Sequence, residues 1–140
     1  MSELVANASC VAIDGRAVLI EGPPAAGKSS LALALIDRGA MLVGDDGVML
    51  EERTGRLIAH PATTIAGKLE IRGVGIAELP ATSAPLGLRV RLSAGAPRFV
   101  ETAERSALCG TMLPALTLYP DLATLPLRCE WAMRLHGLPG

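Results

Sequence analysis

The chain has few aromatic side chains: one Phe, one Tyr and one Trp among 140 residues. Proteins that hold single-stranded nucleic acid stack its bases on such rings, so the composition disfavours this class. The formal net charge of −1 and the pI near 6.1 also lack the basic excess that draws proteins to nucleic acids and anionic membranes. The composition therefore predicts that the partners include neither nucleic acid nor a membrane surface.

Long apolar runs are missing as well, because each apolar segment is short and interrupted by charge. Residues 1–4 carry no basic stretch followed by a hydrophobic one, so we expect a cytoplasmic protein without a signal peptide or a membrane span. The three cysteines, Cys10, Cys109 and Cys129, are odd in number and widely spaced. This pattern fits neither a disulfide framework nor a zinc cluster, and we expect the cysteines to act as small hydrophobic residues.

Half of the residues are hydrophobic, and with so few rings the core must be built from Ala, Leu, Val and Ile. A length of 140 residues suffices for one such core. We expect a single domain over residues 1–140.

A glycine-rich segment follows the apolar run 17–20 and reads GPPAAGKS over residues 22–29. Its spacing, G-x-x-x-x-G-K-[ST], is typical of a loop that binds the phosphates of a nucleotide. Gly22 and Gly27 let the backbone turn tightly enough for N–H groups to point at phosphate oxygens, and the helix that follows presents its positive end to the same anion. Lys28 supplies a mobile charge for the β and γ phosphates, and the Ser29 hydroxyl is placed to ligate magnesium. We therefore predict ATP and Mg²⁺ as cofactors.

The predicted nucleotide contacts are Gly22, Pro23, Pro24, Ala25, Ala26, Gly27, Lys28, Ser29 and Ser30. The alternative is a glycine-rich turn that caps a helix and binds nothing. A strand before the segment and a helix after it are the context that the motif requires, and the pattern predicts both.

An acidic doublet follows the next strand. A helix over 28–38 ends at Gly39, and the strand 41–43 runs into Gly44, Asp45 and Asp46. A right-handed strand–helix–strand crossover returns the end of the second strand to the edge where the loop lies, so we expect both aspartates to flank the γ-phosphate. One would hold magnesium and the other would accept a proton from an incoming hydroxyl. A polar turn before Gly47 is the alternative reading of the doublet.

The segment 67–76 alternates apolar residues with charges of both signs. Glu70 and Arg72 share one face of an extended segment because side chains alternate with a period of two. A carboxylate beside a guanidinium can bind metal and phosphate together, whereas a surface strand with an ion pair would carry the same pattern.

The remaining elements are indicated by alternation and turn signals. We predict hairpins over 10–13 with 17–21 and over 47–52 with 56–60, strands over 86–93 and 113–118, a helix over 127–135, and a helical or irregular segment over 101–109. His60, alone at a strand end, is expected to pack or cap rather than to catalyse.

Three of these elements, in order, resemble the catalytic domain of bacterial HPr kinase/phosphorylase: the loop 22–29, the strand end 42–46, and the run LEIRGVGI over residues 69–76. That family phosphorylates a serine of an HPr-type phosphocarrier and can reverse the reaction with inorganic phosphate. The resemblance implies an α/β fold of the phosphoenolpyruvate-carboxykinase-like P-loop type, with a mixed sheet and few helices. It also implies homo-oligomers, hexamers in the family.

Roles follow from the resemblance residue by residue. Lys28 would stabilise the transferring phosphoryl group, Ser29 and Glu70 would hold magnesium, and Asp45 is a further metal candidate. The aspartate pair would supply the acid and base, with Asp46 preferred over Asp45, and Arg72 belongs to the run that the family uses in both directions.

The chain departs from the family pattern in three places. Its length resembles the short single-domain forms of alphaproteobacteria, without the N-terminal domain of full-length members. Asn7 stands where the family has a histidine tied to phosphate handling, and no counterpart of the late Pro- and Arg-containing loop follows Pro80. Phosphorolysis therefore does not follow from the resemblance, and a small-molecule or nucleotide kinase and a non-catalytic ATP-binding sensor stay open as alternatives.

Overall fold

The computed structural model describes residues 2–140 and contains two helices and eleven strands within them. The elements are β1 Ser2–Ala6, β2 Ser9–Ile13, β3 Arg16–Glu21, α1 Lys28–Asp37, β4 Met41–Gly44, β5 Gly47–Arg53, β6 Arg56–Pro61, β7 Lys68–Ile71, β8 Gly75–Glu78, β9 Ala84–Leu92, β10 Glu104–Leu108, β11 Thr111–Leu118 and α2 Leu125–His136. The predicted class, a mixed sheet with few helices, is confirmed.

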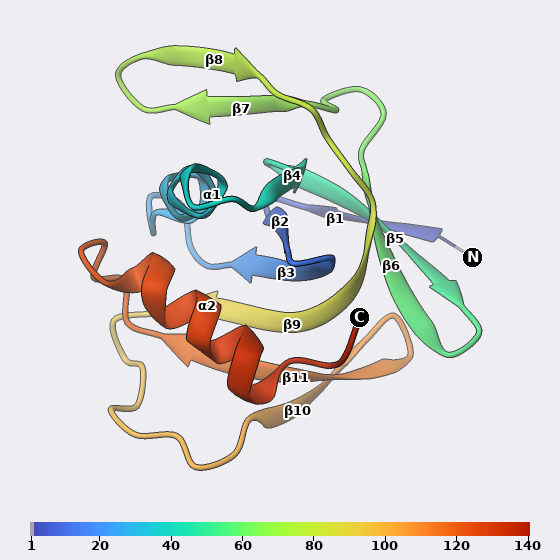
Figure 1. Ribbon diagram of the computed structural model, residues 1–140, viewed down its shortest axis with the longest axis vertical. Helices are drawn as coiled ribbons and strands as arrows, with labels where there is room; N and C mark the ends of the chain where they lie inside the picture. The colour runs from blue at the N-terminus through green and yellow to red at the C-terminus, as the bar shows by residue number, and fades with distance from the viewer. Residues whose placement is uncertain (1) are drawn as a thin grey trace.

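Nine strands form one mixed sheet with β9 at its centre. The main order is β1-β5-β6-β9-β3-β2-β4, and β11 adds to β9 and carries β10. The first residues of β9 pair with β6, and its later residues pair in parallel with β3 and β11. β9 therefore connects the strands β1, β5 and β6 to the rest of the sheet (Figure 1).

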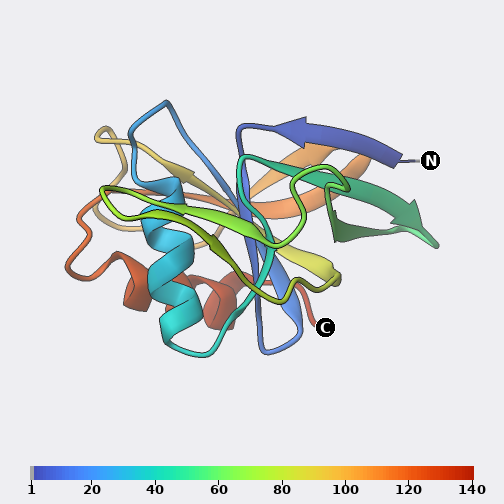
Figure 2. The same cartoon turned by 90° about the horizontal axis from the view of Figure 1, so that it is seen from above.

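The two faces of the sheet carry two separate cores. Both helices pack on one face, where Val18, Leu88 and Val90 meet Leu31 of α1 and Met133 of α2. On the other face the strands β1, β5 and β6 fold over, and a second cluster includes Leu19, Val48, Leu50, Leu57 and Leu113. Seen from above, these strands lie on the far side of the molecule from the helices (Figure 2).

The β2–β3 hairpin and α1 position the loop between them. Asp14 and Gly15 both have positive φ, 49° and 80°, which is the two-residue turn that a D-G pair favours. β3 and β4 run in the same direction, as expected from the crossover, with β2 between them and antiparallel to both. The phosphate-loop segment and the acidic doublet therefore leave the sheet at the same edge.

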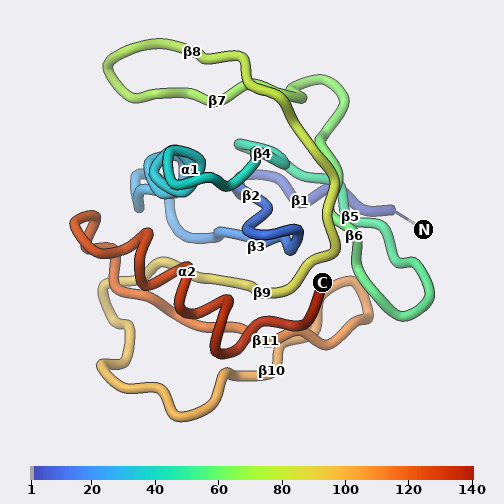
Figure 3. The backbone as a smooth tube through the Cα atoms, in the orientation of Figure 1, coloured from blue at the N-terminus to red at the C-terminus, as the bar shows by residue number. Residues whose placement is uncertain are grey.

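Two expectations are corrected and one strand was missed. The segment 101–109 is not helical: it contains β10, which pairs with β11. The strand β1 was not predicted. The run 67–76 is not one extended segment but a hairpin, because Gly73 and Gly75 take positive φ of 77° and 142° and reverse the chain between β7 and β8. Figure 3 shows this hairpin standing apart from the main sheet, above α1.

Candidate active site

The glycine-rich loop turns tightly between β3 and α1. Ala25 and Gly27 adopt left-handed backbone conformations, with φ of 64° and 100°, and Gly27 is the N-cap of α1. A Cβ atom on Gly22 would lie 3.2 Å from the Leu92 carbonyl oxygen, so this position has little room for a side chain. Within residues 2–140 no side chain caps the N-terminus of α1, and its first turn carries no acidic residue. The positive end of the helix is therefore left to an anion.

Lys28 folds back over the loop. Its Nζ donates hydrogen bonds to the carbonyl oxygens of Gly22, at 2.7 Å, and Pro23, at 3.1 Å. Among the described residues the Lys28 ammonium makes no ion pair with a carboxylate. Its charge is available to phosphate oxygens.

Asp45 is the buried centre of the site, with only 6% of its surface exposed. Its Oδ1 accepts hydrogen bonds from the hydroxyls of Ser29, at 2.7 Å, and Ser9, at 2.8 Å. Its Oδ2 accepts a longer one, 3.3 Å, from the Glu70 backbone N–H. One carboxylate thus ties the start of α1, the strand β2 and the hairpin β7–β8 together.

The doublet is divided between two environments, although both members were expected beside the γ-phosphate. Asp46 is exposed and has a positive φ of 62°. Its carbonyl oxygen accepts a hydrogen bond of 3.3 Å from the Asn7 N–H. The turn depends on glycine, because a Cβ atom on Gly44 would collide with the carbonyl oxygen of Gly47.

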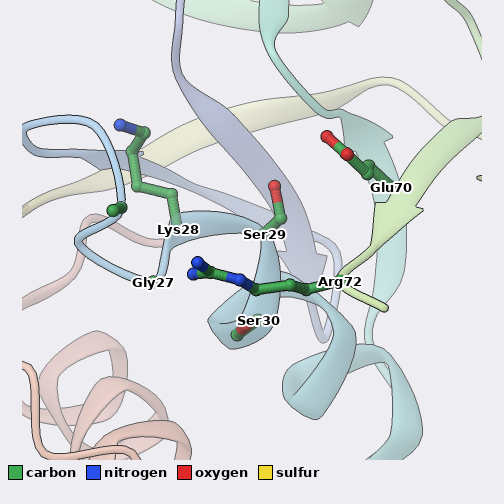
Figure 4. A pocket seen from close by; sticks show the side chains of 7 residues that line it. Gly27, Lys28, Ser29, Ser30, Glu70 and Arg72 are labelled. Atoms are coloured by element: carbon green, nitrogen blue, oxygen red, sulfur yellow. The ribbon is translucent and has the colours of Figure 1, made fainter. Parts of the chain in front are cut away.

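The loop and the hairpin β7–β8 enclose one open pocket of about 340 Å³. Its lining residues are Ala25, Gly27, Lys28, Ser29, Ser30, Glu70 and Arg72. In the close-up the Glu70 carboxylate lies on the side of Ser29, and the Arg72 side chain extends toward Gly27 (Figure 4). Glu70 and Arg72 therefore line the same pocket as the phosphate loop, Glu70 from β7 and Arg72 from the turn that follows it.

Some predicted contacts lie elsewhere. Gly22 and Pro23 line a second pocket of about 450 Å³, on the side of Asn7 and Arg91. Pro24 and Ala26 line neither pocket. Asp45 lies behind Ser29 rather than in the pocket wall.

Sequence reasoning missed Ser9 as a partner of Asp45. Ser9 is 1% exposed among apolar neighbours at the start of β2. A lone hydroxyl in a buried apolar strand needs a hydrogen-bond partner. The position of Ser9 in the apolar strand β2 could therefore have predicted that its hydroxyl is hydrogen-bonded. The strand sequence does not reveal that the partner is Asp45, which is 36 residues away in the chain.

Some charged groups outside the pocket have structural partners. Glu21 and Arg89 form an ion pair beneath the loop, and its hydrogen bond raises the pKa of Arg89. His60 bonds Ser83 and Glu51, as expected of a packing residue, and its hydrogen bond lowers the pKa of Glu51. Burial raises the pKa of Cys129 to about 12, which suits an unreactive core thiol.

Comparison with known proteins identifies the family. A family model described as HPr Serine kinase C-terminal domain matches residues 2–83, which is more than half of the chain. The chain belongs to this family. Its expected fold and resemblance are thereby confirmed.

Two curated relatives of this HPr serine kinase family are the HPr kinase/phosphorylases of Clostridium tetani, 44% identical over 70 residues, and of Clostridium acetobutylicum, 44% identical over 71 residues. Each match covers about half of this chain, 50% and 51%, but only 23% of the relative. The chain thus matches less than a quarter of the length of these relatives.

A solved structure extends the likeness to nearly the whole chain. The Hpr(Ser) kinase/phosphatase from Coxiella burnetii superposes with a TM-score of 0.83 at 28% identity, over 94% of each chain. Over the part of the chain that the structure describes, no helix combines the length and apolar character needed to cross a bilayer.

Proposed function

We propose that this chain is an ATP- and Mg²⁺-dependent kinase that phosphorylates a serine of an HPr-like phosphocarrier protein. The observation that carries the proposal is the convergence of Lys28, Ser29 and Glu70 on one pocket, with Asp45 fixing Ser29 from behind. Membership of the HPr serine kinase family supports the carrier as acceptor.

The residues present suit magnesium. The ion prefers oxygen ligands and keeps several waters, so it needs only one or two protein groups beside substrate phosphates. The Ser29 hydroxyl donates its hydrogen to Asp45, which leaves its oxygen lone pairs for a cation. Glu70 adds a carboxylate on the same side of the pocket (Figure 4). Mg²⁺ bound there would neutralise charge on the β and γ phosphates.

The chain's own groups then have separate tasks. The backbone N–H groups at the start of α1 would hold phosphate oxygens, and Lys28 would leave the loop carbonyls to follow the transferring group. Arg72 would add a guanidinium toward the phosphates. Such sites work mainly by positioning and by stabilising charge.

Asp46 is the group that we propose as the base. The Asp45 oxygens already accept three hydrogen bonds, whereas Asp46 is exposed and can meet a hydroxyl on another protein. The serine oxygen would form a bond to the γ-phosphorus while the bond to the leaving ADP oxygen breaks, and the serine proton would pass to Asp46.

Incubation with labelled ATP, Mg²⁺ and a purified HPr-like carrier tests the proposal. We expect label on a carrier serine, and removal of the ion by EDTA should abolish it. Label on a small molecule would favour a metabolite kinase, and nucleotide binding without transfer would favour a sensor. Either result would overturn the proposed activity.

The same assay run backward tests reversibility. Phosphorylated carrier and inorganic phosphate should release pyrophosphate if phosphorolysis belongs to this chain. Asn7→His supplies the comparison, because it introduces the ring found at this position in the resembled family. We also propose homo-oligomers, hexamers by resemblance, which light scattering would detect.

A further inference from the structure

The loop between β11 and α2, residues 119–124, is held by one side chain that the proposed function does not use. The Arg128 Nη2 donates to the carbonyl oxygens of Tyr119, at 2.8 Å, and Asp121, at 3.1 Å. Its Nε donates to the Thr124 hydroxyl at 3.1 Å. A planar guanidinium that fills three acceptors of one short loop fixes the shape of that loop.

This loop delivers an apolar side chain to the phosphate loop. A Cβ atom placed on Gly27 would lie 3.4 Å from a methyl group of Leu122, so Leu122 occupies the side of Gly27 on which a side chain would project. Leu122 nevertheless remains 54% exposed. Gly27, which Leu122 approaches, lines the pocket.

The pocket therefore has two unlike ends. Ser29 and Glu70, with Asp45 behind them, form the oxygen-rich end, where the reacting phosphate and its cation belong. Gly27 lies at the other end, with the Arg72 side chain extending toward it and Leu122 beside it. A nucleotide whose γ-phosphate and cation lie at the oxygen-rich end would extend its nucleoside past Gly27 toward Leu122, the apolar side chain beside that end.

We propose that Leu122 is the wall against which the base of the donor nucleotide rests, and that Arg128 is the positioning residue that holds this wall. The inference rests on the proposed function and assigns the nucleoside part of the same site. A leucine contact reads no hydrogen-bonding edge of a base, so adenine and guanine nucleotides should bind with similar affinity.

Calorimetry with two probes tests the wall: Mg-ATP, and Mg-tripolyphosphate, which carries the phosphates without a nucleoside. Leu122→Ser should weaken Mg-ATP binding about tenfold, the loss expected from exposing part of a leucine contact, and leave tripolyphosphate within about twofold. The control is Leu127→Ser, an exposed leucine of α2, which should change neither.

The outcomes separate the two proposals. Unchanged Mg-ATP binding in Leu122→Ser, or an equal loss for both probes, would overturn the wall while the kinase stands. A wild-type chain that binds neither probe would overturn the kinase and the wall together.

Substitution at Arg128 tests the positioning role. Arg128→Gln should raise KM for ATP about as much as Leu122→Ser and leave kcat for carrier phosphorylation within about twofold, because the reacting end is untouched. Arg128→Lys keeps one charged donor for the loop carbonyls. Its KM for ATP should therefore lie between those of the wild type and Arg128→Gln. A fall in kcat with KM unchanged would contradict the assignment, and thermal unfolding of each variant shows whether it is folded.

Discussion

Residues 2–83 and 84–140 differ in how they resemble known proteins. The family model covers only the first region, whereas the likeness to the Coxiella burnetii structure runs over 94% of the chain. The first region supplies every residue of the proposed phosphate pocket. The second supplies β9, β11 and α2, whose apolar side chains complete the core beneath it.

The two regions differ because a binding site and a hydrophobic core constrain the sequence in different ways. A phosphate loop needs particular residues at particular spacings, so its sequence stays recognisable. A core needs apolar volume in the right pattern and tolerates many combinations of Leu, Val and Ala. A fold can therefore remain alike where the sequence likeness has ended. The two regions nevertheless share one sheet, because β9 pairs with β3 directly beneath the loop.

Lys28→Ala should have the largest effect on the first region's chemistry. Loss of the ammonium should reduce carrier phosphorylation on the order of 10³-fold, because it removes a charge aimed at the transferring group. A radiolabel transfer assay measures it. Lys68→Ala is the control, an exposed lysine at the start of β7 that lines no part of the pocket. Near-normal transfer by Lys28→Ala would refute the assigned role.

Leu88→Ala probes the second region. Leu88 is fully buried in β9 and packs in the core on the helix face. The truncation should lower the free energy of unfolding by about 2–5 kcal/mol, from lost burial and the cavity left behind. Urea denaturation measures it. The exposed Leu127 gives the matched control, and an equal loss in Leu127→Ala would contradict this account of the core.

Asp45→Asn and Asp46→Asn divide the acidic doublet. Asp45→Asn should cost about 1–3 kcal/mol of stability, because an amide in place of a carboxylate disrupts the bonds from Ser9 and Ser29. Asp46→Asn should leave thermal unfolding unchanged and reduce transfer. If Asp46→Asn kept full transfer while Asp45→Asn stayed folded and inactive, the base would be Asp45.

The smallest expected effect is the pH dependence of the pair Glu51–His60, which lies outside the pocket. The hydrogen bond from His60 holds the pKa of Glu51 below its ordinary value of 4.5. A carboxyl whose folded pKa is lowered stabilises the fold above its unfolded pKa, and the gain is lost as pH falls through the folded value. Glu51→Gln should therefore lower Tm slightly at pH 7 and match the wild type near pH 3. A difference in Tm that persists at pH 3 would contradict this cause.

The sequence predicted what local spacing determines. The loop, α1 and the β2–β3 hairpin follow from a motif, a helical pattern and a D-G turn, and β11 forms despite Pro114. β1 was missed because it is a mostly exposed strand whose pairing with β5 lies more than forty residues away. β10 was missed because the pattern ERSAL alternates weakly and is organised by β11.

At the candidate site the same limit applies. A shared site for Lys28, Ser29, Glu70 and Arg72 was implied by the family resemblance, and in the structure all four line one pocket. The separation of Asp45 from Asp46 was not, because it depends on a glycine turn and on the burial of one carboxylate. The approach of Leu122 to Gly27 joins positions 95 residues apart and lies beyond any local pattern.

A crystal structure with Mg²⁺ and a non-hydrolysable ATP analogue would test the central claim most directly. We predict the γ-phosphate between the Lys28 ammonium and the Ser29 hydroxyl, the cation on Ser29 and Glu70, and the base beside Leu122. A nucleotide bound away from the loop 22–29, or a cation that none of these side chains approaches, would contradict it.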